Sequence, residues 1–210
     1  MTTSTTTRSV LIVAATDAEV AALRPVVRDT VRLIVTGVGM VATAARCARE
    51  LARRRCDFAL NLGLCGSFDP SLRPGDVVHV VRDRIAELGA EDDEAFLTMA
   101  DIGLPADAVF VNAHPPANAA LRGLREADGI TVNTVHGCDR SIAAVVARFQ
   151  PQVESMEGAA FMCACLINGV AFAQVRAVSN VVERRNLAAW RMSEAIDSLA
   201  EATRRIIERA

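Results

Sequence analysis

The sequence contains no lysine, so all 23 basic residues of this 210-residue chain are arginine. That absence excludes a Schiff-base lysine and the phosphate-binding lysine of a P-loop. Charged residues interrupt every apolar stretch before it reaches the roughly 18 residues that a membrane-spanning helix requires. Residues 1–7 form a Ser/Thr-rich run without the basic and apolar regions of a signal peptide. We therefore expect a cytoplasmic protein with no membrane partner.

Aromatic residues make up only 4% of the chain, and the formal net charge is −2. Stacking side chains and a broad basic surface are both scarce, so we expect no nucleic-acid partner and a small molecule as the ligand. Cysteine and histidine show no metal-binding spacing such as Cys-x-x-Cys, so we expect neither a metal site nor a cofactor. Most cysteines are interpreted as small buried apolar residues. The six are Cys47, Cys56, Cys65, Cys138, Cys163 and Cys165.

A hydrophobic fraction of 51% with 23% charged residues fits one domain with a full core. We expect a disordered tail over residues 1–8 and one domain over residues 9–210, since no internal repeat or linker interrupts the chain. Short apolar runs alternate with helix-periodic segments, which predicts an α/β sheet covered on both faces. Strands are predicted at residues 9–15, 31–36, 58–62, 76–81, 130–135 and 171–179. Helices are predicted up to residue 27 and over residues 40–54, 141–149, 156–168 and 187–209, with loops at residues 63–75 and 86–117.

Four polar or glycine-bearing segments follow predicted strands or lie next to them. Ligands of open α/β sheets bind outside the carboxyl ends of the strands, so these segments predict the site. They are residues 16–19, 63–67, 154–158 and 179–186. Each has an ordinary structural explanation, and Thr16-x-x-Glu19 in particular fits a helix-capping box.

In combination, these segments resemble a known family. Ala15-x-x-x-Glu19-Val, NLGLCGS at residues 61–67, PGDV at 74–77, ESMEGA at 154–159 and RAVSN at 176–180 occur in this order along the chain. The set resembles the methylthioadenosine/adenosylhomocysteine nucleosidase branch of the nucleoside phosphorylase superfamily. Further runs, ELGAE at 87–91 and VSNVVE at 178–183 with Trp190, resemble the futalosine hydrolases. The resemblance implies a three-layer α/β/α sandwich around a mixed sheet, and the release of hypoxanthine from futalosine in menaquinone biosynthesis.

The resemblance also implies roles for individual residues. Glu19 is expected to hold and activate the attacking water, and Met156 and Glu157 to bind the ribose, with Glu157 accepting hydrogen bonds from its hydroxyls. Asn180 is expected to contact the edge of the base, and Gly66 lies in the matching glycine segment. Related nucleosidases often stack an aromatic residue on the base. The matching stretch, HGCDR at residues 136–140, has none, so Arg140 is the candidate for stacking or a helix-start charge.

Asn180 carries the prediction of substrate. Adenine-specific relatives place aspartate at this position, which suits the N6 amine and N7. A 6-oxopurine presents an acceptor, O6, to which an amide donates while its oxygen faces N7–H. A matched two-point contact discriminates by roughly 1–3 kcal/mol, which favours hypoxanthine over adenine.

The first loop predicts a hydrolase. It carries two carboxylates and no arginine, and those charges repel phosphate, so water is the expected nucleophile. The benzoate tail of futalosine calls for an arginine under the 86–117 loop, from Arg82, Arg84, Arg140, Arg184 or Arg185. Rival functions are cleavage of another purine nucleoside (methylthioadenosine, adenosylhomocysteine or aminodeoxyfutalosine) and nucleoside binding without catalysis. A homodimer or higher homo-oligomer is also expected.

Overall fold

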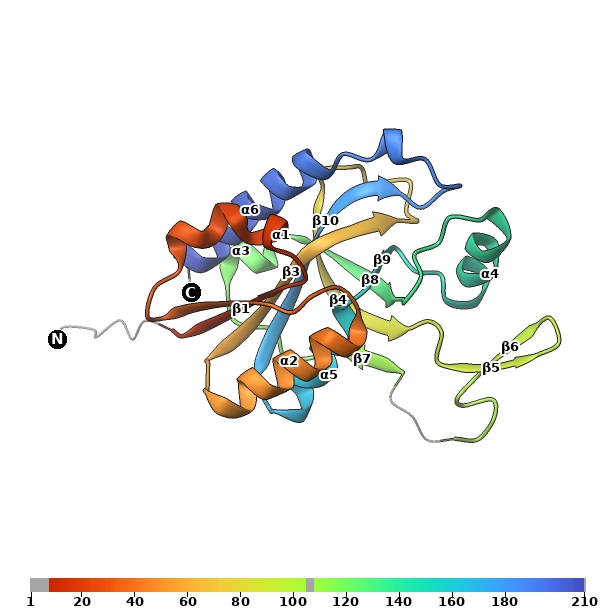
Figure 1. Cartoon of the computed structure of the whole chain (residues 1–210), viewed down its shortest axis with the longest axis horizontal. Coiled ribbons are helices and arrows are strands. Elements are labelled where there is room, and N and C mark those ends of the chain that lie inside the picture. Colours follow the sequence, from red (N-terminus) through yellow and green to blue (C-terminus); the bar gives the residue numbers. More distant parts are fainter. Residues whose placement is uncertain (1–7, 105–107, 210) are drawn as a thin grey trace.

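The computed structural model describes residues 8–104 and 108–209, and it shows helices packed on both sides of a central mixed sheet (Figure 1). The predicted α/β/α sandwich is confirmed. Of the predicted tail, residues 1–7 lie outside the described residues.

The sheet is built around β3 (Phe58–Ser67), which pairs in parallel with strands on both of its sides. On one side the order is β3, β1 (Val10–Ala14) and β2 (Val31–Val35); on the other, β3 pairs with β10 (Ala171–Val181). From β10 the sheet continues through β4 (Val77–Ile85), β8 (Arg125–Thr131) and β9 (Val153–Ser155) and returns to β3. β7 (Val109–Val111) adds to β4. The carboxyl ends of β1, β3 and β10 therefore lie at one edge.

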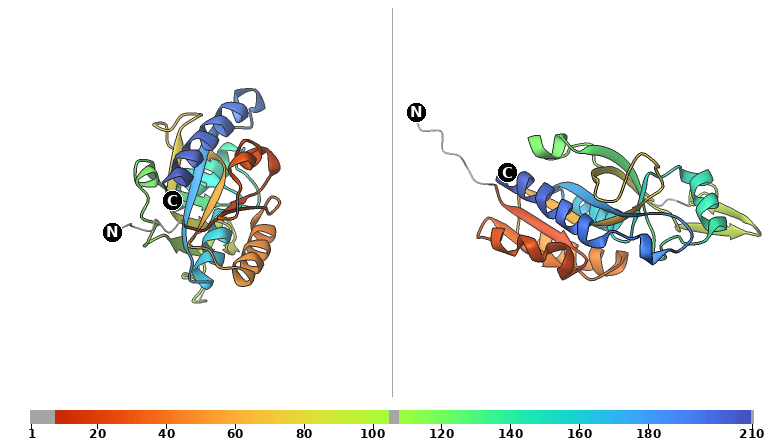
Figure 2. Two further views of the ribbon diagram at one scale, coloured as in Figure 1. Left: turned by 90° about the vertical axis from the view of Figure 1, so that its left-hand side faces the viewer. Right: turned by 90° about the horizontal axis from the view of Figure 1, so that it is seen from above.

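Two hydrophobic clusters cover the two faces of the sheet. Side chains of β3 alternate between them, with Ala59 and Cys65 in one and Leu60 and Leu62 in the other, as the two-residue period of a strand requires. The first cluster contains α2 (Met40–Arg53) and α5 (Gly158–Ile167), and the second contains α6 (Met192–Glu208) with the short α1 (Asp17–Val20) and α3 (Ala119–Arg122). Figure 2 shows α6 and α2 on opposite sides of the sheet. α4 (Asp139–Phe149) covers a smaller third cluster.

The predicted loop at residues 63–75 is wrong in its first part, because β3 continues to Ser67. Its glycines do not end the strand, since pairing with β10 extends over the whole length of β3. The prediction of a loop over residues 86–117 is also wrong. This segment contains the hairpin β5 (Gly89–Asp92) and β6 (Ala95–Thr98), which projects from the body of the protein, and β7 (Figure 1). The hairpin strands pair only with each other and bury little, so they carry no apolar alternation.

Several boundaries differ from the predictions. The strand predicted at 130–135 is β8, which begins five residues earlier because its polar first residues, Arg125 and Glu126, pair with β4. The helix predicted from residue 187 is a 3₁₀ turn, Leu187–Ala189, followed by α6. The helix before residue 27 is α1 followed by a 3₁₀ segment, Ala21–Val26, that contains Pro25. Over residues 8–104 and 108–209, no helix is long and apolar enough to cross a membrane.

Candidate active site

A cavity of about 250 Å³ opens at the edge where β1, β3 and β10 end. All four segments singled out in the sequence contribute to its wall, through Glu19, Gly66, Met156, Glu157 and Asn180 among others. The remaining lining residues are Ala15, Thr16, Val38, Leu64, Cys65, Val135, His136, Glu154, Ser155, Ser179, Arg185, Trp190 and Met192.

The 154–158 segment reaches this cavity by an antiparallel route. β9 runs against β3, with Glu154 opposite Gly66 and Val153 opposite Ser67. The chain that leaves β9 therefore travels back along β3, toward the level of Gly63. This reversal brings Glu157 next to Arg176 of β10, the residue opposite Gly63 in the pairing with β3.

The Glu19 carboxylate accepts four hydrogen bonds. Its Oε2 accepts from the backbone N–H of Ala15 (3.1 Å), and from the N–H (2.9 Å) and hydroxyl (3.1 Å) of Thr16. Its Oε1 accepts from the N–H of Leu64 in β3, at 3.2 Å. The capping interaction predicted from the sequence is therefore present, but a cap does not require the bond to a distant strand. A carboxylate oxygen has about two acceptor positions, so Oε1 keeps one for a further donor.

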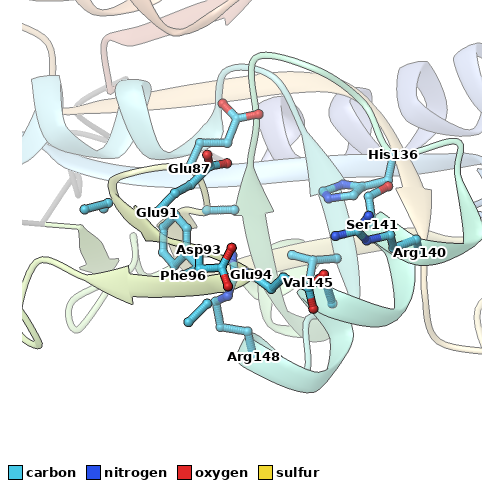
Figure 3. Close-up of a pocket in the computed structure, with 15 residues that line it drawn as sticks. Glu87, Glu91, Asp93, Glu94, Phe96, His136, Arg140, Ser141, Val145 and Arg148 are labelled. Carbon is cyan, nitrogen blue, oxygen red and sulfur yellow. The ribbon is translucent and has the colours of Figure 1, made fainter.

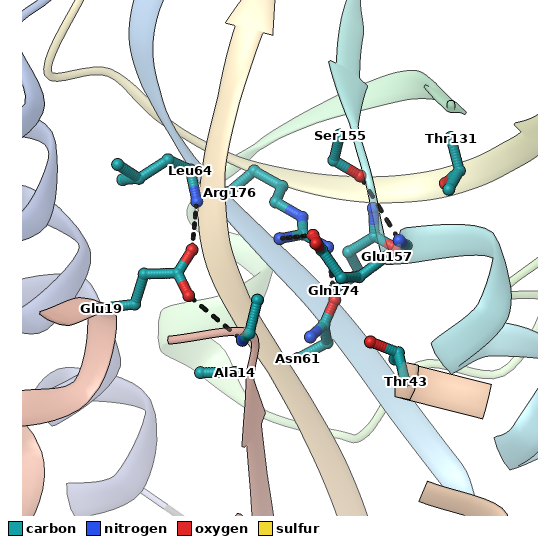
Figure 4. Close-up of polar contacts among 12 residues, drawn as sticks. Ala14, Glu19, Thr43, Asn61, Leu64, Thr131, Ser155, Glu157, Gln174 and Arg176 are labelled. Carbon is teal, nitrogen blue, oxygen red and sulfur yellow. Dashed lines mark hydrogen bonds and ion pairs between the residues drawn. The ribbon is translucent and has the colours of Figure 1, made fainter. Parts of the chain in front are cut away.

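Arg176 is the most deeply buried charge of the site, with a side chain only 1% exposed. Its Nη2 donates to Oδ1 of Asn61 at 2.6 Å, and its Nη1 lies 3.7 Å from Oε2 of Glu157 (Figure 4). Asn61 is held in turn by donation to the backbone oxygen of Val13, at 3.0 Å. This chain of contacts joins β1, β3, β10 and the start of α5 into one rigid support.

Gly63 allows Arg176 and Glu19 to approach each other. A Cβ at this position would lie 2.0 Å from Nη1 of Arg176 and 3.0 Å from Oε1 of Glu19. Real side-chain carbons do not tolerate such distances, so any other residue would displace the guanidinium. The glycine therefore places the free side of the Glu19 carboxylate next to a cation.

Glu157 lies at the start of α5 and is nearly buried. Its Oε1 accepts from the N–H of Gly39 at 3.0 Å, while its Oε2 faces Arg176. Gly39 has a φ of +98°, a conformation that favours glycine. Met156, the preceding residue, lines the same cavity.

Asn180 lies near the end of β10, where β10 pairs with β3 at Gly66. Its Oδ1 accepts from the Ser179 hydroxyl at 2.8 Å, and its Nδ2 donates to the backbone oxygen of Val181 at 2.9 Å. An amide has two N–H groups and two oxygen lone pairs, so one of each stays available to a ligand. Gly66 lies beside it, and a Cβ there would be 3.3 Å from Nδ2 and 2.7 Å from Val182.

Arg140 lies outside this cavity. It lines a neighbouring cavity of about 520 Å³ between α4 and the β5–β6 hairpin, whose wall carries the acidic residues Glu87, Glu91, Asp93 and Glu94 (Figure 3). The larger volume does not make this the better candidate, because the converging polar groups lie in the smaller cavity. Among the residues that the structure describes, His136 alone lines both cavities.

Behind the site, Asp83 supports the start of α5. Its carboxylate accepts from the Thr131 hydroxyl and from Nε2 of Gln174, both at 2.8 Å. Burial raises the pKa of Asp83 to about 6, although these donors and Arg176 oppose the shift. The described residues contain no group of three or more His, Cys, Asp or Glu side chains that could hold a metal ion.

Comparisons with known proteins identify the family to which this architecture belongs. The model of the phosphorylase superfamily matches residues 24–210. The chain belongs to the phosphorylase superfamily. A futalosine hydrolase of Thermus thermophilus is 35% identical over 182 residues, which cover 82% of this chain and 79% of the relative. A futalosine hydrolase of Streptomyces coelicolor is 32% identical, covering 81% and 75%.

Solved structures of the superfamily share the fold. The native futalosine hydrolase of Helicobacter pylori superposes with a TM-score of 0.81 at 14% identity, covering 97% of this chain and 99% of that one. A methylthioadenosine/adenosylhomocysteine nucleosidase of Colwellia psychrerythraea, in complex with adenine, superposes with a TM-score of 0.80 at 22% identity, covering 97% and 96%. At such identities the match concerns the fold alone.

Several residues that the structure places at the site have no role predicted from the sequence. Arg176 stood within a quoted motif, and an arginine inside the apolar strand at 171–179 is itself a signal, because a buried charge requires a partner. Asn61 gives a similar signal in β3. Glu154, His136 and Trp190 line the cavity, but only the pairing of β3 with β9 shows that Glu154 and Gly66 are opposite each other.

Proposed function

We propose that this phosphorylase-superfamily protein hydrolyses the N-glycosidic bond of futalosine and releases hypoxanthine, a step of menaquinone biosynthesis. The observation that carries the proposal is the Glu19 carboxylate. Its Oε2 is saturated by the cap, while its Oε1 keeps an acceptor position at the cavity next to Arg176. Identity of 35% to a futalosine hydrolase over most of both chains supports the choice of substrate.

The reaction is a dissociative substitution. As the C1′–N9 bond breaks, its electron pair goes to the purine and positive charge develops on the ribose. Glu19 holds a water through Oε1 and takes one of its protons while the oxygen bonds to C1′. The departing base takes up a proton at N7 from solvent and Glu19 returns its proton to solvent, so the net reaction consumes one water. Positioned acid–base groups of this kind contribute about 10²–10⁴-fold.

Glu157 and Met156 form the ribose platform. Glu157 accepts hydrogen bonds from the sugar hydroxyls, and its negative charge stabilises the developing cation. Arg176 and the Gly39 N–H fix the orientation of this carboxylate. Because Nη1 of Arg176 and Oε1 of Glu19 also lie on either side of the bare Gly63 position, Arg176 acts as a positioning residue shared by the ribose and water subsites.

Asn180 selects a 6-oxopurine. The N–H that it does not use for Val181 donates to O6, and the lone pair that it does not use for Ser179 accepts from N7–H. Phosphate is not the expected nucleophile, because Glu19 places a carboxylate of the first loop in the cavity wall; the other carboxylate of that loop, Asp17, pairs with Arg24. Arg176, which lies beside Glu19 across Gly63, is already paired with Glu157.

Among the candidate arginines, Arg185 fits the tail carboxylate best. It lines the cavity, and its guanidinium lies 5.8 Å from the ring of Trp190, which lines the same wall. Arg82 pairs with Asp128, Arg84 lies over Phe149, and Arg184 is not among the residues that line the cavity. Arg140 lines the other cavity, so we assign it no contact with the substrate.

We also propose a cytoplasmic homodimer or higher homo-oligomer built from a single catalytic domain. Val38 lines the cavity and is 57% exposed, and Val41 on α2 is 83% exposed, so the mouth carries an uncovered apolar edge. Light scattering at micromolar concentration tests this assembly. A monomer with full activity contradicts it.

The function is tested by incubating the purified protein with a small panel of nucleosides and measuring free base by chromatography. The panel contains futalosine, aminodeoxyfutalosine, methylthioadenosine, adenosylhomocysteine and inosine. We expect hypoxanthine from futalosine at the highest kcat/KM. Preferential release of adenine would favour the methylthioadenosine activity named for a relative that is 32% identical, and binding without release would favour a nucleoside-binding protein.

A further inference from the structure

Glu154 is a nearly buried carboxylate, with a side chain 4% exposed, to which the hydrolytic steps assign no role. It lines the cavity from β9 and is clamped by a single residue, His136. Its Oε2 lies 2.6 Å from Nδ1 of His136, and its Oε1 accepts from the backbone N–H of His136 at 3.1 Å. Because a carboxylate only accepts, Nδ1 carries the hydrogen in this pair.

Glu154 and Asn180 are brought together by Gly66. In the sheet, Gly66 is the register partner of Asn180 on one side and of Glu154 on the other. Residues side by side in a sheet point to the same face. A Cβ on Gly66 would lie 3.3 Å from Nδ2 of Asn180 and 3.5 Å from Cγ of Glu154. The two side chains therefore lie on either side of the space above Gly66, where no side chain is present.

The hydrogen-bonding edge of a 6-oxopurine matches the pair of side chains, Asn180 and Glu154. Its N7 and O6 lie on one side of the edge, and N1, the next ring atom after the C6 that carries O6, bears a hydrogen. In a 6-aminopurine, N1 instead presents a lone pair. Each Glu154 oxygen donates nothing and has one acceptor position beyond the bond to His136. A carboxylate at this place therefore attracts the first kind of base and repels the second.

We propose that Glu154, oriented by His136, accepts the N1–H of the base and is a specificity-determining residue for 6-oxopurines. The proposal rests on the proposed function, because it assumes a 6-oxopurine base next to Asn180. The ring of His136 also packs against Phe68, with centroids 6.1 Å apart in an edge-to-face arrangement. His136 acts as a positioning residue that keeps the carboxylate turned toward the cavity.

The test measures dissociation constants of free hypoxanthine and adenine by calorimetry, so it does not depend on turnover. Wild-type protein is compared with Glu154→Gln, which keeps the shape but turns one acceptor into a donor. The matched control is Glu87→Gln, because Glu87 also accepts from a backbone N–H and a side chain, both of Asn133, and does not line this cavity. Circular dichroism monitors folding in each case.

We expect the wild-type protein to prefer hypoxanthine, Glu154→Gln to lower the hypoxanthine-to-adenine affinity ratio by about tenfold or more, and Glu87→Gln to leave it unchanged. A second pair of variants tests the positioning role. His136→Asn retains an N–H donor near Nδ1 and keeps the ratio, whereas His136→Ala lowers it. Loss of affinity for both bases alike in Glu154→Gln, or a wild-type protein without preference, overturns the proposal.

Different results would overturn the role of Glu154 and the proposed catalytic function. A shifted ratio in Glu154→Gln, in a protein that cleaves no nucleoside of the panel, preserves the role of Glu154 and overturns the catalytic function. Futalosine cleavage with an unchanged ratio does the reverse.

Discussion

The Arg176 guanidinium lies 3.7 Å from the Glu157 carboxylate, and both side chains are withdrawn from solvent, at 1% and 7% exposure. A guanidinium can serve Glu157 and Asn61 at once because its N–H groups form a planar fork, whereas an ammonium is a compact point charge. This pair therefore determines how the ribose carboxylate is presented to the cavity.

Arg176→Lys is expected to lower kcat/KM for futalosine by about 10²-fold, because misplacement of a positioned group by about 1 Å has that effect. It should also destabilise the fold by about 1–3 kcal/mol, since a buried polar partner is left unpaired. The matched control is Arg205→Lys in the exposed i,i+4 pair with Glu201, where both quantities should stay near wild type. Turnover near wild type in folded Arg176→Lys would contradict the shared positioning role.

Glu19→Gln should fold but lose about 10²-fold or more in turnover. The glutamine oxygen can replace the capping Oε2, but an amide cannot take a proton from water, and its NH₂ would face the N–H of Leu64. Asn118→Ala controls for loss of a cap, because Asn118 accepts from the N–H groups of Ala120 and Leu121 at the start of α3. It also removes the donation from Asn118 to the backbone oxygen of Ile206, so it should cost about 2–4 kcal/mol of stability and leave the turnover of the folded protein intact. Wild-type turnover in Glu19→Gln would reduce Glu19 to a cap.

Gly63→Ala should reduce kcat/KM by about 10²-fold with a smaller effect on binding of free base, because the new methyl group displaces Nη1 of Arg176. Gly123→Ala is the matched control. A Cβ there meets its nearest atoms at 3.5 and 3.7 Å, an ordinary contact, and its φ is −81°. Steady-state kinetics with thermal unfolding distinguish the two variants, and equal activities would show that the Glu19–Arg176 approach is not required.

Asn180→Asp should shift preference from 6-oxo toward 6-amino purine nucleosides, with a large loss of futalosine cleavage. The exchange is expected to be partial, because Leu64 and Glu154 stay unchanged in the same wall. The measurement is kcat/KM for futalosine and its 6-amino analogue, with Asn168→Asp, outside this cavity wall, as the control. A ratio that moves by less than about threefold would mean that Asn180 does not contact the base edge.

Asp83 predicts a pH dependence of stability. Its folded-state pKa, raised to about 6 from 3.8, means that the folded protein binds this proton more tightly than the unfolded chain. The associated stability is therefore complete below pH 4 and is lost as the pH rises through 6. Asp83→Asn lacks this titration, and its amide can donate to the otherwise unpaired Oε1 of Gln174.

Urea unfolding of wild type and Asp83→Asn between pH 4.5 and 7.5 measures this difference, because all other titrating groups are shared. Wild type should lose about 2 kcal/mol relative to the variant over this window, out of the roughly 3 kcal/mol that a shift of about two pKa units represents. A difference that stays constant with pH would contradict a raised pKa.

The sequence predicted the sandwich and the four segments of the site because both depend on local patterns: apolar runs, their spacing, and polar residues where strands end. Glu157 is held by Gly39 and Arg176, two distant partners that such patterns do not specify. The Arg176–Asn61 bond depends on the parallel register of β10 with β3, and the Glu154–Gly66 pairing depends on the reversed direction of β9. Neither is encoded within a short window.

The hairpin within residues 86–117 could not be predicted from the sequence, because its stability depends on distant contacts. The hairpin is stabilised by its own pairing and by contacts with α4. The guanidinium of Arg148 in α4, for example, lies 3.9 Å from the ring centroid of Phe96, which is 52 positions earlier in the chain. Polar strands with little burial leave no apolar periodicity. Arg140 is exposed at the start of α4 and lines the neighbouring cavity, which fits the helix-start alternative and not the stacking one.

The central claim is that water, held by Glu19, attacks the C1′ carbon of futalosine. Cleavage in phosphate-free ¹⁸O-labelled water, followed by mass spectrometry of both products, tests it most directly. The account predicts unlabelled hypoxanthine and one ¹⁸O atom in the sugar product, at the same rate with or without added phosphate. Formation of a sugar phosphate, a rate that requires phosphate, or no release of hypoxanthine would contradict it.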